Sequence, residues 1–599
     1  MNLTTWQLLT DKVPKNLKEL ESILLANRGI KDKKQFFHPK HPEDISLVEV
    51  DIDPSSVKVL LKRLKQAKLN QEKVVVFGDY DVDGISATAI LWQVLYAYGL
   101  DVVPFIPMRN KHGYGLSLKA LPDLLALKPN LVITVDNGIV AFKPAQKLSQ
   151  LGVDLIITDH HQEEIKEVKN IKKSEPDAQM RSTNESVRLK LSKPDREFAQ
   201  QASSGRINKG VNLPKALAVV HSTQLCGASL AWMVAREVVN TFSIKFKVND
   251  LLDLAGMATI ADQVPLLSAN RSFAYYGLKQ LRKTKNVGLL ALMKQAGVKD
   301  LSQVDEFTVG YVLAPRINAL GRLSHGLEAL RLLCSTSSVK ASKRAQVLSE
   351  TNLARQTLTT DAYAQARLMV KQKNLTENKI IIVSSEVFHE GVIGLIAGRL
   401  VEEFARPSLV IALGDKKIAK GSARSLPGVH ITQLLRQVRQ ELTEVGGHPM
   451  AAGFGLEVKN LDNFTQKLTQ LANETIDESL LTTQKQAEAV LPFQLVNLKL
   501  VDLLDKFRPF GMKNPLPLFE LKKLKIVSLK VLGNGNKHLK LLLRPANQLK
   551  AQPLEALWWG GGEKINELEV GQALDVLVKI EKNKWNGREK VQLVMVGKD

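Results

Sequence analysis

Short runs of β-branched residues alternate with helical segments in the N-terminal part of this 599-residue chain. A short apolar run bounded by Gly, Asp or Asn is typical of a buried strand, whereas apolar residues at helical spacing predict a helix. The expected strands cover residues 73–77, 102–106, 131–135 and 155–158, and the expected helices cover 57–69, 87–98 and 141–150. Strands that alternate with helices form βαβ units, so the pattern predicts an α/β domain with a mainly parallel sheet.

The rest of the chain predicts three further parts. A helical run without Pro or Gly near 340–372 is a plausible connector, and a second set of alternating strands and helices follows it. The C-terminal part contains five short β-like runs broken by Gly and Asn turns, which favour a small barrel of the oligonucleotide-binding (OB) type. The predicted organisation is an N-terminal segment at 1–55, an α/β domain at 56–340, a connecting helix at 341–375, a smaller α/β domain at 376–475 and the barrel at 490–599.

Residues 163–212 interrupt this organisation. They contain eleven Lys or Arg and eight Asp or Glu among Ser, Asn and Gln, with few large apolar side chains. Such a stretch buries little surface on folding, so we predict a mobile surface insertion within the first domain.

The chain carries 83 Lys and Arg against 61 Asp and Glu, for a formal charge of +22. This excess favours a polyanionic partner, although charge alone does not distinguish nucleic acid from a membrane or a ribosome. No apolar stretch approaches the ~18 residues of a membrane span, and the N-terminus does not look like a signal peptide. Because only two cysteines occur, Cys226 and Cys334, we expect no disulfide framework and a cytoplasmic location, without a membrane partner.

Acidic residues directly follow three of the predicted strands. They are Asp79, Asp81 and Asp83 after 73–77, Asp136 after 131–135, and Asp159, followed by His160 and His161, after 155–158. The carboxyl ends of parallel strands share one edge of a sheet, so these side chains are expected to converge. Carboxylates are the ligands of hard divalent cations, and an added imidazole shifts the preference from Mg²⁺ toward Mn²⁺. The sequence therefore predicts a metal site at this edge.

Turn formation is the alternative explanation, because Asp and Gly are also common where a strand simply ends. For any one of the three motifs the two explanations are about equally good, but three together, one with His-His, favour metal binding. A further acid, Asp262, follows an apolar helix expected at 250–261, and by itself it is better explained as a residue at a helix end.

Eight sequence blocks resemble one known family. DYDVDG, VDNG, TDHH and ADQVPL, in this order and spacing, resemble the DHH phosphoesterases. LAPRINALGR, EGVIGLIAGRL, KGSARS and GGHPMAAG bring the chain closer to the family's bacterial single-strand-specific 5′→3′ exonucleases. The resemblance covers roughly 22–599 apart from the insertion. It implies a DHH domain, a smaller DHHA1-type α/β domain and an OB-fold barrel.

The resemblance also implies a metal-binding set for two Mn²⁺ or Mg²⁺ ions. Asp136 is implied as the bridging ligand, and His161 as the residue that faces the scissile phosphate, with Asp136, His160 and His161 as the catalytic residues. The other implied members are the ligands Asp81, Asp83, His160 and Asp262, and the supporting residues Asp79 and Asp159. For Asp262, the resemblance replaces the helix-end explanation.

Substrate-binding residues follow from the same resemblance. Arg109, Ser422 and Arg424 match the family's pocket for a 5′-phosphate, which suits arginine because its planar fork donates two hydrogen bonds to phosphate oxygens. The remaining candidates are Tyr114, Arg316, Asn318, Arg322, Gly446, Gly447 and His448. For each of these, packing or loop structure is an alternative role.

The implied activity is a single-stranded-DNA-specific 5′→3′ exonuclease that releases 5′-mononucleotides by two-metal-ion hydrolysis in DNA recombination and repair. Two alternatives remain open: a DHH phosphodiesterase of short oligonucleotides or cyclic dinucleotides, and a non-catalytic single-strand-binding scaffold. Single-stranded DNA is the expected partner, with a helicase and a single-strand-binding protein, and the chain is expected to be a monomer.

Positive charge in the predicted barrel fits this implied substrate. Residues 521–550 contain eight basic side chains and no Asp or Glu, which suits a groove for non-specific single strands. Lysines at strand edges also prevent aggregation, which is the alternative explanation. The sequence departs from the family at the polar insertion, at His221-Ser222, and at Ala423, where the family often has Gly.

Overall fold

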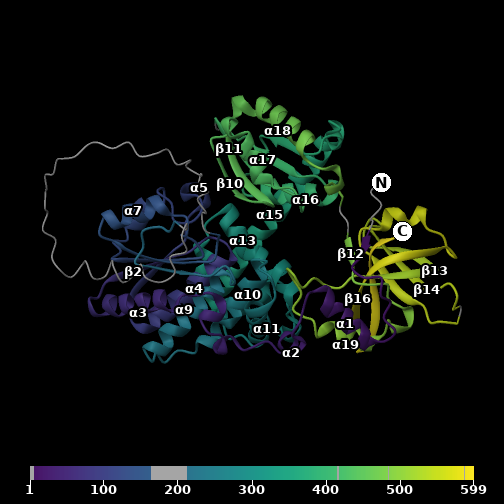
Figure 1. The fold of residues 1–599 in the computed structure, drawn as a ribbon, viewed down its shortest axis with the longest axis horizontal. Coiled ribbons are helices and arrows are strands. Elements are labelled where there is room, and N and C mark those ends of the chain that lie inside the picture. Colours follow the sequence, from purple (N-terminus) through teal and green to yellow (C-terminus); the bar gives the residue numbers. More distant parts are fainter. Residues whose placement is uncertain are drawn as a thin grey trace, which may run out of the picture. The chain divides into compact units, whose positions relative to one another are not determined.

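A computed structural model describes residues 6–162, 212–414, 417–482, 485–548, 550–585 and 587–598 (Figure 1). The predicted insertion at 163–212 lies almost wholly outside these residues. The chain divides into two compact units, one of residues 38–351 and the other of the chain up to Phe37 together with residues 352–599. The domain boundaries expected from the sequence remain a prediction.

The central sheet of the 38–351 unit is parallel throughout, with strand order β3-β2-β4-β5-β6. Its strands are β2 (Lys73–Phe77), β3 (Asp101–Phe105), β4 (Leu131–Val135), β5 (Asp154–Asp159) and β6 (Ala218–His221). The four strands predicted from the β-branched runs are therefore present within a residue or two, and the sheet is parallel as the βαβ pattern predicts.

Helices cover both faces of this sheet because its strands are buried on both sides. On β2, Val74 and Val76 face one core with α3 (Pro54–Leu69), α4 (Val82–Tyr98) and α9 (Gly227–Thr241). Val75 and Phe77 face the other core, with α6 (Leu121–Leu125) and α7 (Phe142–Gln150). Figure 1 shows α7 on one side of the sheet and α3 with α9 on the other. The period of two along a strand explains this two-sided core.

Helix α4 begins five residues earlier than the apolar pattern predicts. Asp81 is its N-cap, and the Asp81 side chain accepts hydrogen bonds from the N–H groups of Asp83 and Gly84. Hydrophobic periodicity does not report this start, because capping groups rather than apolar side chains form the first turn.

A helical layer completes this unit. Helices α10 and α11 pack closely at Gly256 and Gly277, where a side-chain carbon on either glycine would lie 2.4 Å from the other's Cα. The helices of this layer are α10 (Leu252–Ala261), α11 (Ser268–Leu281), α12 (Val287–Gln295), α13 (Ala314–Leu323) and α14 (Leu327–Leu333), with a π-helical turn at Thr308–Leu313 and a short α5 (Arg109–His112) near the sheet edge.

The long helix α15 (Ser338–Gln372) begins in one unit and ends in the other. Ala341, Ala345 and Leu348 belong to the core of the 38–351 unit. Ala362 and Ala366 belong to a core of the 352–599 unit. The uninterrupted helical pattern near 340–372 predicted this helix, although it extends a little further at the N-terminal end.

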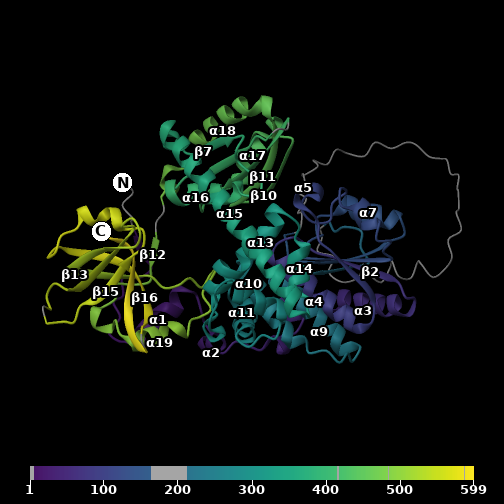
Figure 2. The same cartoon turned by 180° about the vertical axis from the view of Figure 1, so that it is seen from behind.

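The second sheet has strand order β10-β11-β9-β8-β7. Only β7 and β8 are parallel, and the other pairs are antiparallel. Figure 2 shows α16, α17 and α18 beside this sheet. The elements are β7 (Ile381–Ser385), α16 (Ile393–Phe404), β8 (Ser408–Ala412), β9 (Ile418–Arg424), α17 (Ile431–Gln437), β10 (Glu444–His448), β11 (Ala451–Glu457) and α18 (Leu461–Thr475).

The C-terminal strands form a closed barrel in the order β13-β14-β15-β17-β16, as the five β-like runs predict. Closure removes the exposed sheet edges. Its strands are β13 (Phe519–Leu532), β14 (His538–Pro545), β15 (Leu554–Trp558), β16 (Ala573–Trp585) and β17 (Arg588–Lys598), and α19 (Leu498–Asp505) precedes them.

The N-terminal segment packs against the barrel end of the same unit. Strand β1 (Trp6–Leu8) pairs in parallel with β12 (Lys485–Ala487), which lies between the expected bounds of the smaller α/β domain and the barrel. Helix α1 (Leu17–Asn27) ends beside Arg28, which forms a buried ion pair with Glu488 at 2.7 Å, and the short α2 (Lys33–Phe37) follows. Pairing between residues so distant in sequence leaves no local signal.

Among the described residues, no helix is both long enough and apolar enough to cross a membrane.

Asp253 in α10 provides a test of the buried layer. Burial raises the pKa of Asp253 from 3.8 to about 7. Between pH 3.8 and about 7, the folded chain therefore keeps a proton on Asp253 that the unfolded chain loses. As a result, the free energy of unfolding falls by about 1.4 kcal/mol for each pH unit across this range. We expect Asp253→Asn to become more stable relative to the wild type as pH rises from about 4 to about 7. Urea unfolding of both proteins at several pH values checks this, and a pH-independent difference would contradict it.

Candidate metal centre

Acidic side chains gather where three neighbouring strands end. Asp79 follows β2, Asp136 follows β4, and Asp159 ends β5. The order β2-β4-β5 makes these strand ends adjacent. The side chains of all three residues are buried, with at most 3% of their surface exposed. Residues up to 80 positions apart in the sequence thus lie at one edge, where parallel sheets bind ligands.

Two helix N-termini hold the next two acids. Asp81 caps α4, as described above. Asp83 lies in the first turn of α4, and its two carboxylate oxygens accept the backbone N–H groups of Gly227 and Ala228 at 2.6 and 2.8 Å. Gly227 and Ala228 begin α9, so the positive end of a second helix stabilises the Asp83 carboxylate.

Asp136 adopts a left-handed backbone conformation, with φ of 61°. Asp tolerates this region better than most residues. Gly227 lies directly against it, because a side-chain carbon at Gly227 would come within 2.6 Å of Asp136 Cβ. Asn137 fixes the following turn by donating from Nδ2 to the Val135 carbonyl at 2.8 Å and accepting the Leu116 N–H at 3.1 Å. The position of Asp136 is therefore tightly determined.

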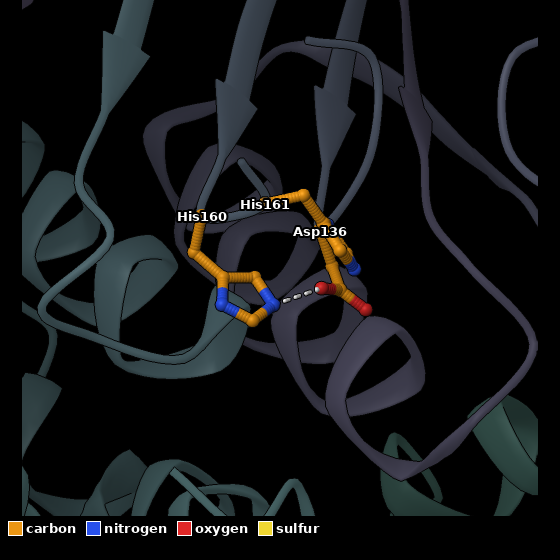
Figure 3. Close-up of side chains that lie close together, drawn as sticks. All are labelled: Asp136, His160 and His161. Atoms are coloured by element: carbon orange, nitrogen blue, oxygen red, sulfur yellow. Dashed lines mark ion pairs between the residues drawn. The ribbon is translucent and has the colours of Figure 1, made fainter. Parts of the chain in front are cut away.

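His160 points its Nε2 atom into this group of carboxylates. Nε2 lies 3.0 Å from Asp136 Oδ1, and a dashed line marks this ion pair in Figure 3. It lies 3.5 Å from Asp83 Oδ2 and 3.8 Å from Asp262 Oδ2. Burial lowers the pKa of His160, which favours the neutral imidazole that ligates metals. His160 therefore joins acids from three different elements.

The carboxylates raise one another's pKa values. Burial is the largest cause and repulsion by neighbouring acids the second: the pKa values of Asp79, Asp81 and Asp136 lie above the ordinary value, and that of Asp262 rises to about 9. Such a group repels itself when ionised. A bound cation would remove this repulsion.

Three atoms test whether the site fits a divalent cation. Asp79 Oδ1, Asp136 Oδ1 and His160 Nε2 are buried and make no hydrogen bond within the described residues. Buried polar atoms without a hydrogen bond are rare and call for a ligand. The donors are carboxylate oxygens and one imidazole nitrogen, which suit Mn²⁺ or Mg²⁺. The residues fit the metal.

The geometry contains three groups of possible ligands, and two of them share no residue. Asp79, Asp81 and Asp136 form one group whose donor atoms lie within 4.8 Å of one another. Asp83, His160 and Asp262 form another on the same criterion. The third group, Asp136, His160 and His161, takes one residue from each of these two sets, and Asp136 Oδ1 lies 3.0 Å from His160 Nε2. Two cation positions with Asp136 between them are consistent with this arrangement.

Asp159 and His161 are engaged differently. Asp159 Oδ1 accepts hydrogen bonds from the N–H groups of His160 and His161, and Oδ2 accepts the Ile139 N–H at 2.8 Å. His161 Nδ1 lies 2.8 Å from Asp159 Oδ1, and His161 Nε2 lies 2.9 Å from the Tyr114 hydroxyl. Burial acts to raise the pKa of Asp159, but the bond from His161 and the backbone bonds outweigh it and keep the pKa low. Asp159 thus orients the His-His pair.

In addition to Tyr114, four substrate-binding candidates lie in the 38–351 unit. Arg109, in α5, is exposed and lies over the ring of Tyr80, with 5.8 Å between Cζ and the ring centroid. Asn318 accepts the Val82 N–H at 2.9 Å, so it supports the start of α4. Arg316 donates to the Val312 carbonyl at 2.6 Å. Arg322 lies in the same helix, α13.

The other candidates lie in the 352–599 unit. Arg424, on β9, donates from Nη1 to Ser422 Oγ at 3.1 Å, next to the start of α16 at Gly394. The remaining candidates, Gly446, Gly447 and His448, are exposed on the edge strand β10. Ala423 is buried in β9 without a positive φ, so it is compatible with the backbone there.

Sequence reasoning missed several residues of the site. Gly227 gave only the weak signal of a glycine before an apolar helix. His221, at the end of β6, has its Nε2 atom 2.7 Å from the His161 carbonyl. His112 is buried, accepts the Met108 N–H at Nδ1, and lies 3.0 Å from Asp123 through Nε2, which fixes the turn that carries Arg109. Hydrogen bonds of this kind depend on tertiary structure.

Three family models match the chain. The DHH family, N-terminal domain, matches residues 73–218, the DHHA1 domain matches residues 377–474, and the RecJ OB domain matches residues 487–597. The first match contains all of the site's acids except Asp262.

Curated proteins are similar over most of the chain. The single-stranded-DNA-specific exonuclease RecJ of Bacillus subtilis is 30% identical over 589 residues, which cover 96% of this chain and 67% of that protein. The protein of the same name from Thermus thermophilus is 30% identical over 547 residues, which cover 90% of this chain and 71% of that protein.

A solved structure is also similar. The crystal structure of RecJ from Thermus thermophilus in complex with Mn²⁺ has a TM-score of 0.76 and 26% sequence identity, covering 99% of this chain and 79% of that chain.

Gly227→Ala tests the packing behind Asp136. The added methyl group would displace the Asp136 carboxylate, so we expect the affinity for Mn²⁺ to fall by at least about tenfold. The measurement is the rise in thermal unfolding temperature on addition of Mn²⁺, which reports binding to the folded state. Gly310→Ala is the matched control, because a side-chain carbon there meets nothing within 4 Å. Equal stabilisation of both variants by Mn²⁺ would contradict the role of Gly227.

Proposed function

This chain belongs to the RecJ family of single-stranded-DNA-specific exonucleases, and on that premise we propose that it degrades single-stranded DNA from the 5′ end to 5′-mononucleotides. It is a metal-dependent exonuclease, and Mn²⁺ or Mg²⁺ is its cofactor. The observation that carries the proposal is the two ligand sets that meet where Asp136 approaches His160. In these sets, Asp79 Oδ1, Asp136 Oδ1 and His160 Nε2 are buried and make no hydrogen bond among the described residues. Its place in DNA recombination and repair follows from this activity.

The residues that would hold two ions are the members of these two sets, with Asp136 between them. Bound ions at such a site would lower the pKa of a bound water, so that hydroxide is available at neutral pH, and would stabilise charge on the leaving oxygen. The chain's own contribution is to fix the donors. The N-termini of α4 and α9 hold Asp81 and Asp83, and Gly227 leaves room for Asp136.

His161 is proposed to contact the scissile phosphate. Asp159 accepts the Nδ1 proton of His161, so Nε2 remains directed toward Tyr114. Burial acts to lower the pKa of His161, but the Asp159 carboxylate outweighs it and raises the pKa, which favours a proton on both ring nitrogens. His161 could then donate from Nε2 to a phosphate oxygen in place of the Tyr114 hydroxyl. Tyr114 is half exposed and could stack on a base.

The 5′ polarity requires a binding site for the terminal phosphate. Arg109, Ser422 and Arg424 are proposed to form it, since two guanidinium groups and a hydroxyl offer hydrogen bonds to several phosphate oxygens. We further propose that Arg316, Asn318 and Arg322 support the strand near the metal centre. The exposed edge of β10, with Gly446, Gly447 and His448, would lie against the strand, because glycines allow close backbone approach.

The barrel is also proposed to hold the strand. Lys525, Lys530 and Lys540 belong to β13 and β14, in the stretch without acidic residues. Non-specific binding through such charges falls steeply with salt.

Partners and location are also proposals. A helicase that supplies single strands and a single-strand-binding protein that covers them would both present the substrate, and the chain would act as a monomer in the cytoplasm. Light scattering of the purified chain tests the monomer, and co-purification from cells with and without nuclease digestion separates protein partners from proteins held by DNA.

Asp136→Asn tests the metal centre. Loss of the carboxylate between the two ligand sets should reduce hydrolysis of 5′-phosphorylated single strands in Mn²⁺ by at least about 100-fold. Binding of the strand should change little, because the basic residues remain. The measurement is mononucleotide release from an end-labelled strand, with a dinucleotide and a duplex as comparison substrates.

Asp300→Asn is the control, since Asp300 is an exposed cap of a short 3₁₀ turn and Asn caps equally well. It should retain wild-type activity. Full activity of the Asp136→Asn protein would refute the proposed site, and faster cleavage of the dinucleotide than of long strands would favour the short-oligonucleotide phosphodiesterase.

Arg109→Gln and Arg424→Gln test the polarity. Each should reduce the preference for a 5′-phosphate over a 5′-hydroxyl by about tenfold, the ordinary value of one or two charge-assisted hydrogen bonds. Initial rates on the two substrates give the ratio for each variant. A ratio equal to that of the wild type would show that these arginines do not contact the terminal phosphate.

A further inference from the structure

Two arginines on adjacent helices of the 352–599 unit have no carboxylate partner among the described residues. Arg355 lies on α15 and Arg399 on α16. Within the part of the chain that the structure describes, neither guanidinium makes a hydrogen bond or an ion pair. Arg355 is partly buried, and its Nε atom is inaccessible to solvent and donates to no described residue. A buried donor without an acceptor is costly, which distinguishes Arg355 from an ordinary surface arginine.

Glu403, four residues after Arg399 on α16, is already engaged by other side chains. Glu403 accepts a hydrogen bond from the Tyr363 hydroxyl and another from Arg367 Nε at 2.6 Å. Arg399 lies over the ring of Tyr363, with 5.5 Å between Cζ and the ring centroid. The ring therefore orients the guanidinium of Arg399 without neutralising it.

The charge of Arg399 acts on the guanidinium of Arg355. Burial lowers the pKa of Arg355 and the charge of Arg399 lowers it further. A pair of like charges on packed helices, one of them partly desolvated, is relieved by an anion that binds both.

One member of the pair, Arg399, lies on the helix that begins at the candidate phosphate pocket. Ala362 and Ala366 of α15 and Ile396 and Leu400 of α16 belong to one buried apolar core. At its start, α16 is so close to β9 that a side-chain carbon on Gly394 would lie 3.0 Å from both Arg424 Nη2 and Ser422 Oγ. Arg399 follows five residues later, about 7.5 Å along the helix axis.

We propose that Arg355 and Arg399 form a second phosphate-binding site in this unit. Its ligand is a phosphate group, either a backbone phosphodiester of the bound single strand or the phosphate of a 5′-mononucleotide. Guanidinium groups suit phosphate because their planar donor arrays match its oxygens. The strand as ligand rests on the proposed function, whereas the mononucleotide as ligand does not.

The experiment uses the full-length chain with Arg355→Gln, Arg399→Gln or the control Arg436→Gln. Arg436 is exposed in the last turn of α17 and has no part in the pair. Binding of a labelled 5′-phosphorylated strand is measured by fluorescence anisotropy at several salt concentrations. All proteins carry Asp136→Asn, so that the strand stays intact. Binding of a 5′-mononucleotide alone is measured by calorimetry on the same proteins.

If the strand is the ligand, Arg355→Gln and Arg399→Gln each weaken strand binding by about three- to tenfold. The slope of log affinity against log salt then becomes shallower by about 0.7 for each phosphate that the variant no longer neutralises. If the mononucleotide is the ligand, only its affinity falls. Arg436→Gln changes neither. Wild-type values for both ligands in Arg355→Gln and Arg399→Gln overturn the proposal.

The variant Arg355→Lys and the unfolding temperature of each protein distinguish phosphate binding from a structural role of Arg355. Arg355→Lys retains the charge without the planar fork, so it should preserve the salt slope while recovering only part of the affinity. A loss of affinity that Arg355→Lys does not recover at all, together with a lowered unfolding temperature, indicates a structural role and overturns the proposal. Failure of the proposed function is seen separately, as absence of strand degradation by the chain with Asp136 intact.

Discussion

Repulsion among buried carboxylates is the constraint on which the rest of this structure depends. Asp79, Asp81, Asp83, Asp136 and Asp262 share one poorly solvated region, which raises most of their pKa values. The fold opposes this repulsion with oriented backbone donors, of which the N-terminus of α9 against Asp83 is the clearest. The donors do not satisfy every carboxylate atom, and the atoms that remain are those that a divalent cation would bind.

Hydrogen bonding separates acids of the same type into different roles. Asp136 and Asp159 both lie at the end of a buried parallel strand, and both side chains are buried. Asp159 uses both of its oxygens to orient His161 and the neighbouring backbone, whereas Asp136 Oδ1 accepts no hydrogen bond from the described residues and is directed at His160. The same side chain therefore supports the site in one position and offers a metal ligand in the other.

Basic side chains with proposed phosphate-binding roles occur in both units. Arg109 lies in the 38–351 unit, while Arg424, the pair of Arg355 and Arg399, and the lysines of the barrel lie in the other. An enzyme that acts on a polyanion needs carboxylates only where it binds metal, and cations wherever it holds phosphates. The net charge of +22 is consistent with this division of roles.

The sequence by itself determined the parallel sheet, the closed barrel, the long helix and the candidate ligands other than Asp262, because each depends on local periodicity or on residues that follow a strand directly. The role of Asp262 came only from the resemblance to the family. It did not reveal β9 and β10, whose Gly-rich, polar residues carry no strand pattern, or the pairing of β1 with β12, whose partners are far apart in the chain. Only the tertiary structure decided which acids keep an oxygen available for a metal and why Gly227 lies beside Asp136. Those properties arise from contacts between separate elements, and no local pattern encodes them.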